Sequence, residues 1–284
     1  MNFRNPTASI FIQDGKPEPE ALARITHLGI GAHQDDLEFM AFHGITECFY
    51  RTDRFFGGIT CTNGVGSAHI GPYSGYSDEA MRTVRRDEQN KAATVGRYGA
   101  MIQLDYSPGR VRDPQDTALT DDLAAILDVC CPEVVYTHNP ADKHDTHVAV
   151  LISVIRAIRR LPKNRRPVRV LGCEVWRGLD WMPDAEKFVM DVTGHDSLAA
   201  ALNGIFDSQI AGGKRYDLAT LGRRRANATF FEWHATDKAE QILFAMDLSP
   251  LAADESLDLA AHTGAVIGRF RDEVLTRLAK FTGN

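Results

Sequence analysis

Apolar and polar positions alternate along this chain in blocks that predict strands followed by helices. Short apolar runs that end in polar turns are typical of buried strands. Such runs occupy residues 26–32, 55–62, 101–106, 134–137, 168–176 and 188–192. Helical segments are predicted at residues 37–49, 78–98, 121–129, 146–161, 198–210 and 251–281. Strands that alternate with helices predict an α/β fold, with a mostly parallel sheet and right-handed crossovers.

The strand and helix pattern begins near residue 25. Residues 1–24 contain three prolines and little periodicity, so we expect an N-terminal arm that lies on the surface. The sequence shows no internal repeat, and its 284 residues are enough for one large domain. We therefore expect residues 25–284 to form a single domain.

Composition and charge exclude several classes of partner. The net charge of -6 predicts no general attraction to nucleic acid or to an anionic membrane. The sequence has no run of 18 apolar residues, so no transmembrane helix is expected. Five cysteines without a regular spacing indicate reduced thiols and a cytoplasmic protein.

Two clusters of metal-binding side-chain types follow predicted strands. His33, Asp35 and Asp36 come directly after residues 26–32, at the end where open α/β sheets bind ligands. Buried polar groups of this kind are unfavourable without partners. Taken alone, this cluster is also typical of a cap for the helix that follows.

The second cluster follows the predicted strand at 134–137 and contains Asp142, His144 and His147. The two histidines are three residues apart, so they share one face at the start of a helix. Together the clusters offer a mixture of nitrogen and oxygen ligands that suits Zn²⁺. A catalytic zinc typically takes three protein ligands and leaves one position for water.

Both clusters resemble motifs of the LmbE-like family of zinc-dependent N-deacetylases, which includes the de-N-acetylase of the glycosylphosphatidylinositol pathway (PIG-L). Residues 33–38, His-Gln-Asp-Asp-Leu-Glu, are similar to the family's His-Pro-Asp-Asp-x-Glu motif. Residues 142–147 resemble its Asp-x-His-x-x-His motif, and residues 59–64 and 85–93 resemble two weaker ones. The resemblance covers about residues 25 to 160. It implies a Rossmann-like fold with a metal site at the C-terminal ends of the strands.

The resemblance also implies a role for each residue of the two clusters. His33, Asp36 and His147 would hold one Zn²⁺, or another divalent ion, per chain. Asp35 would be the general base that acts on the metal-activated water. His144 would face the developing oxyanion or the leaving nitrogen as an imidazolium.

Two departures from the family motifs affect this picture. Gln34 replaces the usual proline, so the turn loses a fixed φ. Thr146 replaces the aspartate that commonly precedes the last histidine, which leaves His144 without its usual carboxylate partner. We expect Asp142 to take over and to raise the pKa of His144. The alternative is Asp145, which is adjacent in sequence and would point away on a helix.

Four more residues are expected to contact the substrate. Arg85 is suited to bind substrate oxygens, although a salt bridge on the helix surface is an equal alternative. His43 stands where a small residue is usual and would narrow the pocket or add a donor, and Asn63 replaces an acidic residue. Tyr73 lies in the Gly-, Pro- and Ser-rich segment 64–77, a loop of the kind that often covers ligands.

The implied function is that of a hydrolase that removes an acetyl group from the nitrogen of an N-acetylated amino sugar or sugar conjugate. Two alternatives stay open: a catalytically impaired metal- or sugar-binding relative, and a metal-independent glycosidase that uses a pair of carboxylates. The expected partner is a small molecule, and a homo-oligomer is compatible with the sequence. We interpret Arg223–Arg225 as part of a solvated face.

Overall fold

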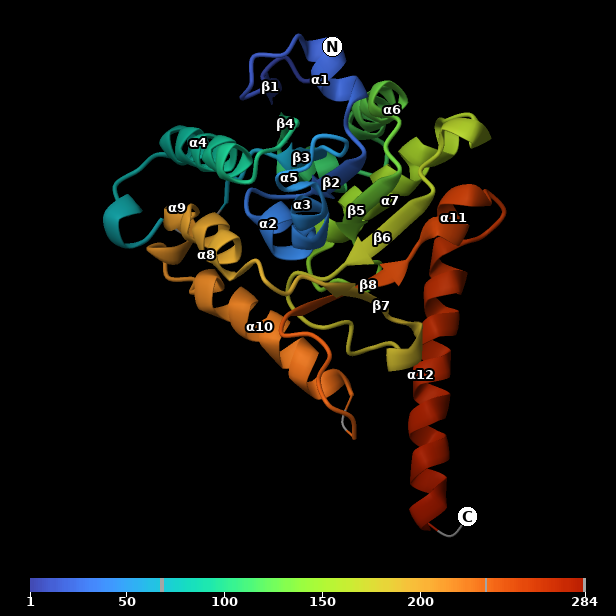
Figure 1. Cartoon of the computed structure of the whole chain (residues 1–284). Helices are drawn as coiled ribbons and strands as arrows, with labels where there is room; N and C mark the ends of the chain where they lie inside the picture. The colour runs from blue at the N-terminus through green and yellow to red at the C-terminus, as the bar shows by residue number, and fades with distance from the viewer. Residues whose placement is uncertain (67–68, 233, 283–284) are drawn as a thin grey trace.

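The computed structural model describes residues 1–66, 69–232 and 234–282. Within these residues, an eight-stranded sheet with the order β1-β4-β3-β2-β5-β6-β8-β7 forms the centre (Figure 1). The strands are β1 (Ser9–Phe11), β2 (His27–Gly31), β3 (Phe56–Thr62), β4 (Ala100–Tyr106), β5 (Val134–His138), β6 (Arg169–Cys173), β7 (Phe188–Asp191) and β8 (Ile242–Asp247). Neighbouring strands from β4 to β6 are parallel, which confirms the predicted mostly parallel α/β sheet.

Helices cover both faces of the sheet, because parallel strands are apolar on both sides. The helices are α1 (Glu18–Ala23), α2 (Asp36–Met40), α3 (Phe42–Cys48), α4 (Asp78–Val95), α5 (Pro108–Arg112), α6 (Ala118–Cys130), α7 (Asp145–Arg160), α8 (Asp196–Gly204), α9 (Asp207–Ile210), α10 (Tyr216–Phe231), α11 (Ser249–Ala253) and α12 (Leu259–Thr282). One core lies between the sheet and α1, α6, α7 and α11. The other lies between the sheet and α2, α3, α4 and α8.

The order of strands places β2 and β5 at a point of reversal. From β2 the sheet continues through β3 and β4 on one side, and through β5 and β6 on the other. Ligands of open α/β sheets bind in the crevice beyond the carboxyl ends of two such strands. Both clusters of candidate ligands follow these two strands, so the topology brings them to one crevice.

Several elements differ from the expected pattern. Residues 1–24 contain α1 and the edge strand β1, which pairs with β4 in antiparallel register. Three predicted helices are interrupted, at Ala41 between α2 and α3, at residues 205–206 between α8 and α9, and at residues 254–258 between α11 and α12. The sequence pattern did not predict α10, which buries only Arg224 and Ala228 along its length. It also missed β8, because a short apolar run does not distinguish a strand from a buried helix.

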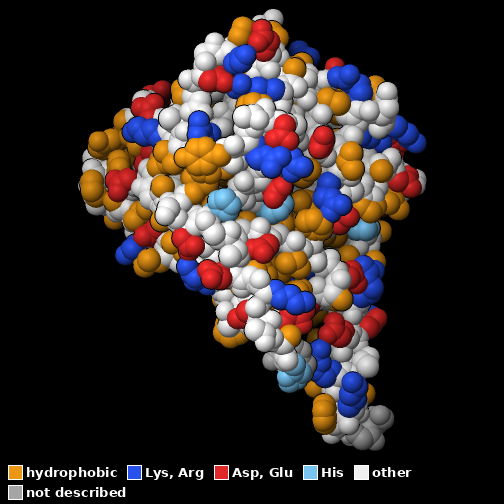
Figure 2. All heavy atoms as spheres, viewed as in Figure 1, with side chains coloured by type: hydrophobic (Ala, Val, Ile, Leu, Met, Phe, Trp, Pro, Cys, Tyr) orange, Lys and Arg blue, Asp and Glu red, His pale blue; other side chains and the backbone are white. Residues whose placement is uncertain are grey.

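The surface has two further features. Basic and acidic side chains are interspersed over the face shown in Figure 2. The helix α12 extends away from the sheet and its covering helices (Figure 1).

Among the described residues, no helix is long and apolar enough to span a bilayer. The division into an arm at 1–24 and a domain at 25–284 stays a prediction.

Candidate metal centre and active site

A tight turn after β2 folds Asp36 back under the end of the strand. Asp35 adopts a positive φ of 91°, a conformation that side chains other than glycine rarely take. Gly31 leaves the space that the turn needs, since a Cβ there would lie 2.9 Å from the Cβ of Asp36. The backbone N–H of His33 donates to Asp36 Oδ2 at 2.7 Å. Strain of this kind is often found at functional turns.

The three predicted ligands converge in this crevice. His33 Nδ1 lies 3.2 Å from His147 Nε2 and 3.4 Å from Asp36 Oδ2. His147 Nε2 lies 3.6 Å from the same carboxylate oxygen. Ligand atoms about 2.0–2.1 Å from a tetrahedral zinc lie about 3.3 Å from one another. The three atoms therefore have the spacing, and the donor chemistry, of ligands around one tetrahedral ion.

His138, at the end of β5, belongs to the same cluster and was missed in the sequence. Its Nε2 accepts the backbone N–H of Ala32 at 2.9 Å, and its ring stacks on His147 with 3.9 Å between centroids. Burial and the neighbouring His147 lower the pKa of His138 to about 4. The same Nε2 lies 3.4 Å from Asp36 Oδ2, so His138 forms a second buried group with Asp36 and His147 that could hold a metal ion. Its place directly after an apolar strand was the available signal.

The Asp142 carboxylate holds His147, and the prediction that it pairs with the His144 ring is wrong. Asp142 Oδ2 lies 3.0 Å from His147 Nδ1, while Oδ1 accepts only the backbone N–H of His144 at 2.9 Å. The turn before α7 brings the carboxylate of Asp142 to the buried ring of His147, which lies in the first turn of the helix. A carboxylate on the far nitrogen fixes the tautomer of a metal-binding histidine and strengthens it as a ligand.

His144 lies beside the cluster as a hydrogen-bond donor. Its Nδ1 accepts the backbone N–H of Thr146 at 3.3 Å at the start of α7, which leaves the proton on Nε2. Burial and the neighbouring His147 and His33 lower the pKa of His144. The neutral ring with an Nε2–H donor therefore replaces the imidazolium expected from the sequence.

Asp35 has the environment of a proton acceptor. Its Oδ2 is buried and has no hydrogen-bond partner among the described residues. Burial and the neighbouring Asp36 raise the pKa of Asp35, and Arg85 opposes this shift.

Arg85 is only 1% exposed, which excludes the alternative of a salt bridge on the helix surface. Its Nε and Nη2 have no partner in the described part of the chain.

A cavity of about 180 Å³, which we call the metal pocket, lies beside this cluster. It is lined by His33, Asp35, Asp36, Phe39, His144, Val175, Trp176, Gln209, Gly212, Lys214 and Tyr216. Burial raises the pKa of Tyr216 to about 12, so its hydroxyl keeps its proton beside the two aspartates. The wall at residues 175–216 was not predicted, because it comes from the part of the chain beyond the motifs.

All four predicted substrate-binding residues, Arg85 among them, lie outside the lining of the metal pocket. His43 Nδ1 lies 2.9 Å from the Tyr136 hydroxyl, which holds it against β5. The side chain of Asn63 closes a local turn by accepting the backbone N–H of Val65. Tyr73 donates its hydroxyl to Asp207 at 2.6 Å, which fastens the loop 64–77 to α9. Residues 67 and 68 of that loop lie outside the described residues.

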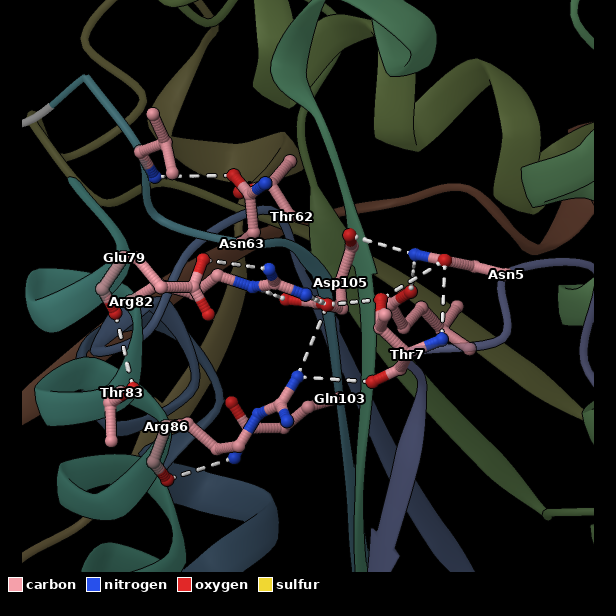
Figure 3. Close-up of polar contacts among 12 residues, drawn as sticks. Asn5, Thr7, Thr62, Asn63, Glu79, Arg82, Thr83, Arg86, Gln103 and Asp105 are labelled. Carbon is pink, nitrogen blue, oxygen red and sulfur yellow. Dashed lines mark hydrogen bonds and ion pairs between the residues drawn. The ribbon is translucent and has the colours of Figure 1, made fainter.

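An ion-pair network beside Asn63 fixes the helix that carries Arg85 (Figure 3). Arg82 Nε donates to Asp105 Oδ1 at 2.8 Å, and Arg86 Nη2 lies 3.1 Å from Asp105 Oδ2. Asp105 is buried near the C-terminal end of β4. Arg82 and Arg86, which flank Arg85 in the sequence, therefore fix α4 against the sheet.

Comparison with known proteins confirms the family resemblance. Residues 28–158 match the model of the PIG-L family, described as GlcNAc-PI de-N-acetylase. No protein among the curated sequences matches this chain.

Solved structures show where else this fold occurs. The conserved protein TT1542 from Thermus thermophilus is 18% identical with a TM-score of 0.60, over 78% of this chain and 94% of that one. GalB, the 4-carboxy-2-hydroxymuconate hydratase from Pseudomonas putida, is 17% identical with a TM-score of 0.62, over 79% and 96%. The N,N'-diacetylchitobiose deacetylase from Pyrococcus horikoshii is 16% identical with a TM-score of 0.56, over 77% and 82%. A hydratase and a deacetylase share this fold, so the reaction has to be argued from the site.

Proposed function

We propose that this protein, whose residues 28–158 match the PIG-L family, is a metal-dependent hydrolase that deacetylates the nitrogen of an amino sugar or sugar conjugate. The observation that carries the proposal is the 3.2–3.6 Å spacing of the ligand atoms of His33, Asp36 and His147. A zinc ion held there would supply Lewis-acid chemistry and a water that ionises near neutral pH. The match to the family, and the set of two imidazole nitrogens and one carboxylate oxygen, support zinc as the ion.

The other residues of the pocket supply proton transfer and charge stabilisation. Asp35 accepts the proton of the attacking water, because burial raises its pKa and its Oδ2 has no competing partner among the described residues. The same carboxyl then delivers the proton to the leaving nitrogen. The Nε2–H of His144 donates to the carbonyl oxygen as negative charge develops there.

The departures from the family motifs leave this constellation intact. Gln34 donates its side-chain amide to the carbonyl of Thr62 at 3.2 Å, so a hydrogen bond holds the turn where the family has a proline. None of the three ligands is replaced. A glycosidase that used Asp35 with a second carboxylate would leave the converged imidazoles of His33 and His147 without a role.

A screen of N-acetylated sugars and sugar conjugates tests this function. We expect the zinc-loaded protein to release free amine from at least one of them, chelation to abolish the release, and added zinc to restore it. Release of a reducing sugar by the metal-free protein, without free amine, would instead identify a glycosidase.

Asp142→Asn tests the support of His147. We expect this variant to bind zinc about 10- to 100-fold more weakly than the wild type. The asparagine amide holds the ring of His147 more weakly than the carboxylate does. Zinc titration against a competing chelator measures this change. Asp145→Asn is the matched control, since Asp145 is exposed on the first turn of the same helix. Equal affinities in the two variants would show that Asp142 does not support the metal site.

A further inference from the structure

The direction of the Asp35 carboxylate depends on what holds the backbone of its turn. The φ of 91° and ψ of -27° of Asp35 lie in the left-handed region, which residues other than glycine rarely adopt. Such a conformation persists only where the surrounding structure holds it. The side chain does not hold itself, because the buried Oδ2 has no hydrogen-bond partner among the described residues. The contacts that fix this residue are therefore those of its backbone.

Gln89 of α4 makes a backbone contact of this kind. Its Oε1 accepts the backbone N–H of Asp35 at 3.2 Å, and its Nε2 donates to Glu38 Oε1 at 2.9 Å. The side chain of Gln89 is fully buried. One amide therefore links the residue before α2 to a carboxylate inside that helix.

Only one orientation of the Gln89 amide satisfies both neighbours. A backbone N–H can only donate, and an ionised carboxylate can only accept, so the oxygen must face Asp35 and the nitrogen must face Glu38. Glu38 is anchored in turn, since its Oε1 accepts the Tyr98 hydroxyl at 2.6 Å and its carbonyl accepts Arg224 Nη2 at 2.6 Å. A fixed acceptor is thus presented to the N–H of Asp35.

This arrangement takes the place of a common helix cap. Asp35 and Glu38 have the spacing of a capping box, in which the first side chain accepts a backbone N–H of the helix and the glutamate accepts the N–H of the first residue. Here Asp35 makes no side-chain cap, and Gln89 stands between its N–H and Glu38. The carboxylate of Asp35 is left for the metal pocket, which it helps to line.

We propose that Gln89 is a positioning residue for Asp35: its amide, oriented by Glu38, holds the left-handed backbone that directs the Asp35 carboxylate to the metal pocket. The inference rests on the proposed function in one respect, since it takes Asp35 as the general base of that reaction. Gln89 itself contacts neither the metal ligands nor the lining of the pocket through its two hydrogen bonds.

Gln89→Met removes both hydrogen bonds and keeps a side chain of similar length. We expect kcat of the zinc-loaded protein on the substrate found in the screen to fall by up to about 10²-fold, the effect of a small displacement of a reacting group. KM and zinc content should change little. Lys91→Met is the matched control, because Lys91 is exposed on the same helix. Loss of zinc from Gln89→Met would show that the amide holds the whole turn, and would overturn the assignment to Asp35.

The same substitution in a protein that already carries Asp35→Asn separates positioning from general support of the fold. A residue that acts only through Asp35 has nothing left to position there, so Gln89→Met should lower kcat little further. Equal losses in the two backgrounds would make Gln89 a structural residue and overturn the inference.

An exchange of the two side chains keeps the inference testable if Gln89→Met does not fold. When Glu38→Gln is combined with Gln89→Glu, the carboxylate at position 89 can still accept the N–H of Asp35, and the amide at position 38 can donate to it. We expect this double variant to have a higher kcat than Gln89→Glu alone, in which two carboxylates face each other. A double variant no more active than Gln89→Glu would overturn the inference.

Amide hydrogen exchange at Asp35, followed by NMR, needs no substrate. We expect the N–H of Asp35 to exchange faster in Gln89→Met than in the wild type or Lys91→Met, because it loses its buried acceptor. Unchanged exchange would overturn the inference, whether or not amides are hydrolysed. If exchange rises as expected while no N-acetyl sugar is hydrolysed, the positioning of Asp35 is supported and the proposed reaction is wrong.

Discussion

Asp35→Asn should keep the bound metal and lower the rate of amide hydrolysis by about 10²- to 10⁴-fold. The asparagine side chain fills the same space, but it cannot take a proton from the attacking water. Asp35 Oδ2 has no hydrogen-bond partner among the described residues, so few native contacts are lost. The measurements are zinc per chain and the release of amine from the substrate found in the screen.

Asp36→Asn is the informative comparison for this variant. Burial by itself would raise the pKa of Asp36, yet the imidazoles of His147 and His138 hold that pKa well below its usual range. A charged carboxylate at this position suits a ligand, so Asp36→Asn should lose zinc as well as activity. Equal loss of zinc from both variants would mean that the roles of general base and metal ligand are assigned to the wrong aspartates.

His147→Ala should abolish zinc binding and, with it, hydrolysis. The substitution removes the Nε2 ligand atom, and it also leaves the carboxylate of Asp142 buried without its partner. Two protein ligands seldom hold a catalytic zinc, which typically has three. Metal analysis after dialysis should find about one zinc per chain in the wild type and a small fraction of this in the variant.

A stability measurement gives the same prediction a second readout. A metal that binds only the folded state raises its stability, so added zinc should raise the unfolding temperature of the wild type but not of His147→Ala. His43→Ala is the control, because His43 contacts Tyr136 outside the lining of the metal pocket and should keep its zinc. Full zinc occupancy in His147→Ala would refute the ligand assignment.

The position of the site was predictable because it depends on local order along the chain. An apolar run followed by His33, Asp35 and Asp36 places these residues at a strand end, and the run before Asp142 does the same for the second cluster. In a parallel sheet such ends share one edge, which is why the 3.2–3.6 Å cluster of ligand atoms could be expected.

The partners of individual side chains were less predictable. Asp142 is two residues from His144 and five from His147, yet its carboxylate contacts the more distant ring. The direction of a side chain in an irregular turn depends on what packs around it, and sequence spacing does not encode this. His43, Asn63 and Tyr73 illustrate the same limit, since each side chain has a hydrogen-bond partner outside the pocket lining, while their roles toward a substrate stay predictions.

The sequence by itself determined the alternation of strands and helices, the strand ends that carry the candidate metal-binding residues, and the chemistry that those residues offer. Only the tertiary structure decided that Arg224 is fully buried over the Phe42 ring, so the expectation of a solvated face at Arg223–Arg225 is wrong for this residue. Charged residues of this kind look like surface residues in a sequence, because burial is a property of long-range packing. The family match covers residues 28–158, while much of the pocket wall, including Trp176 and Tyr216, comes from the part of the chain beyond them.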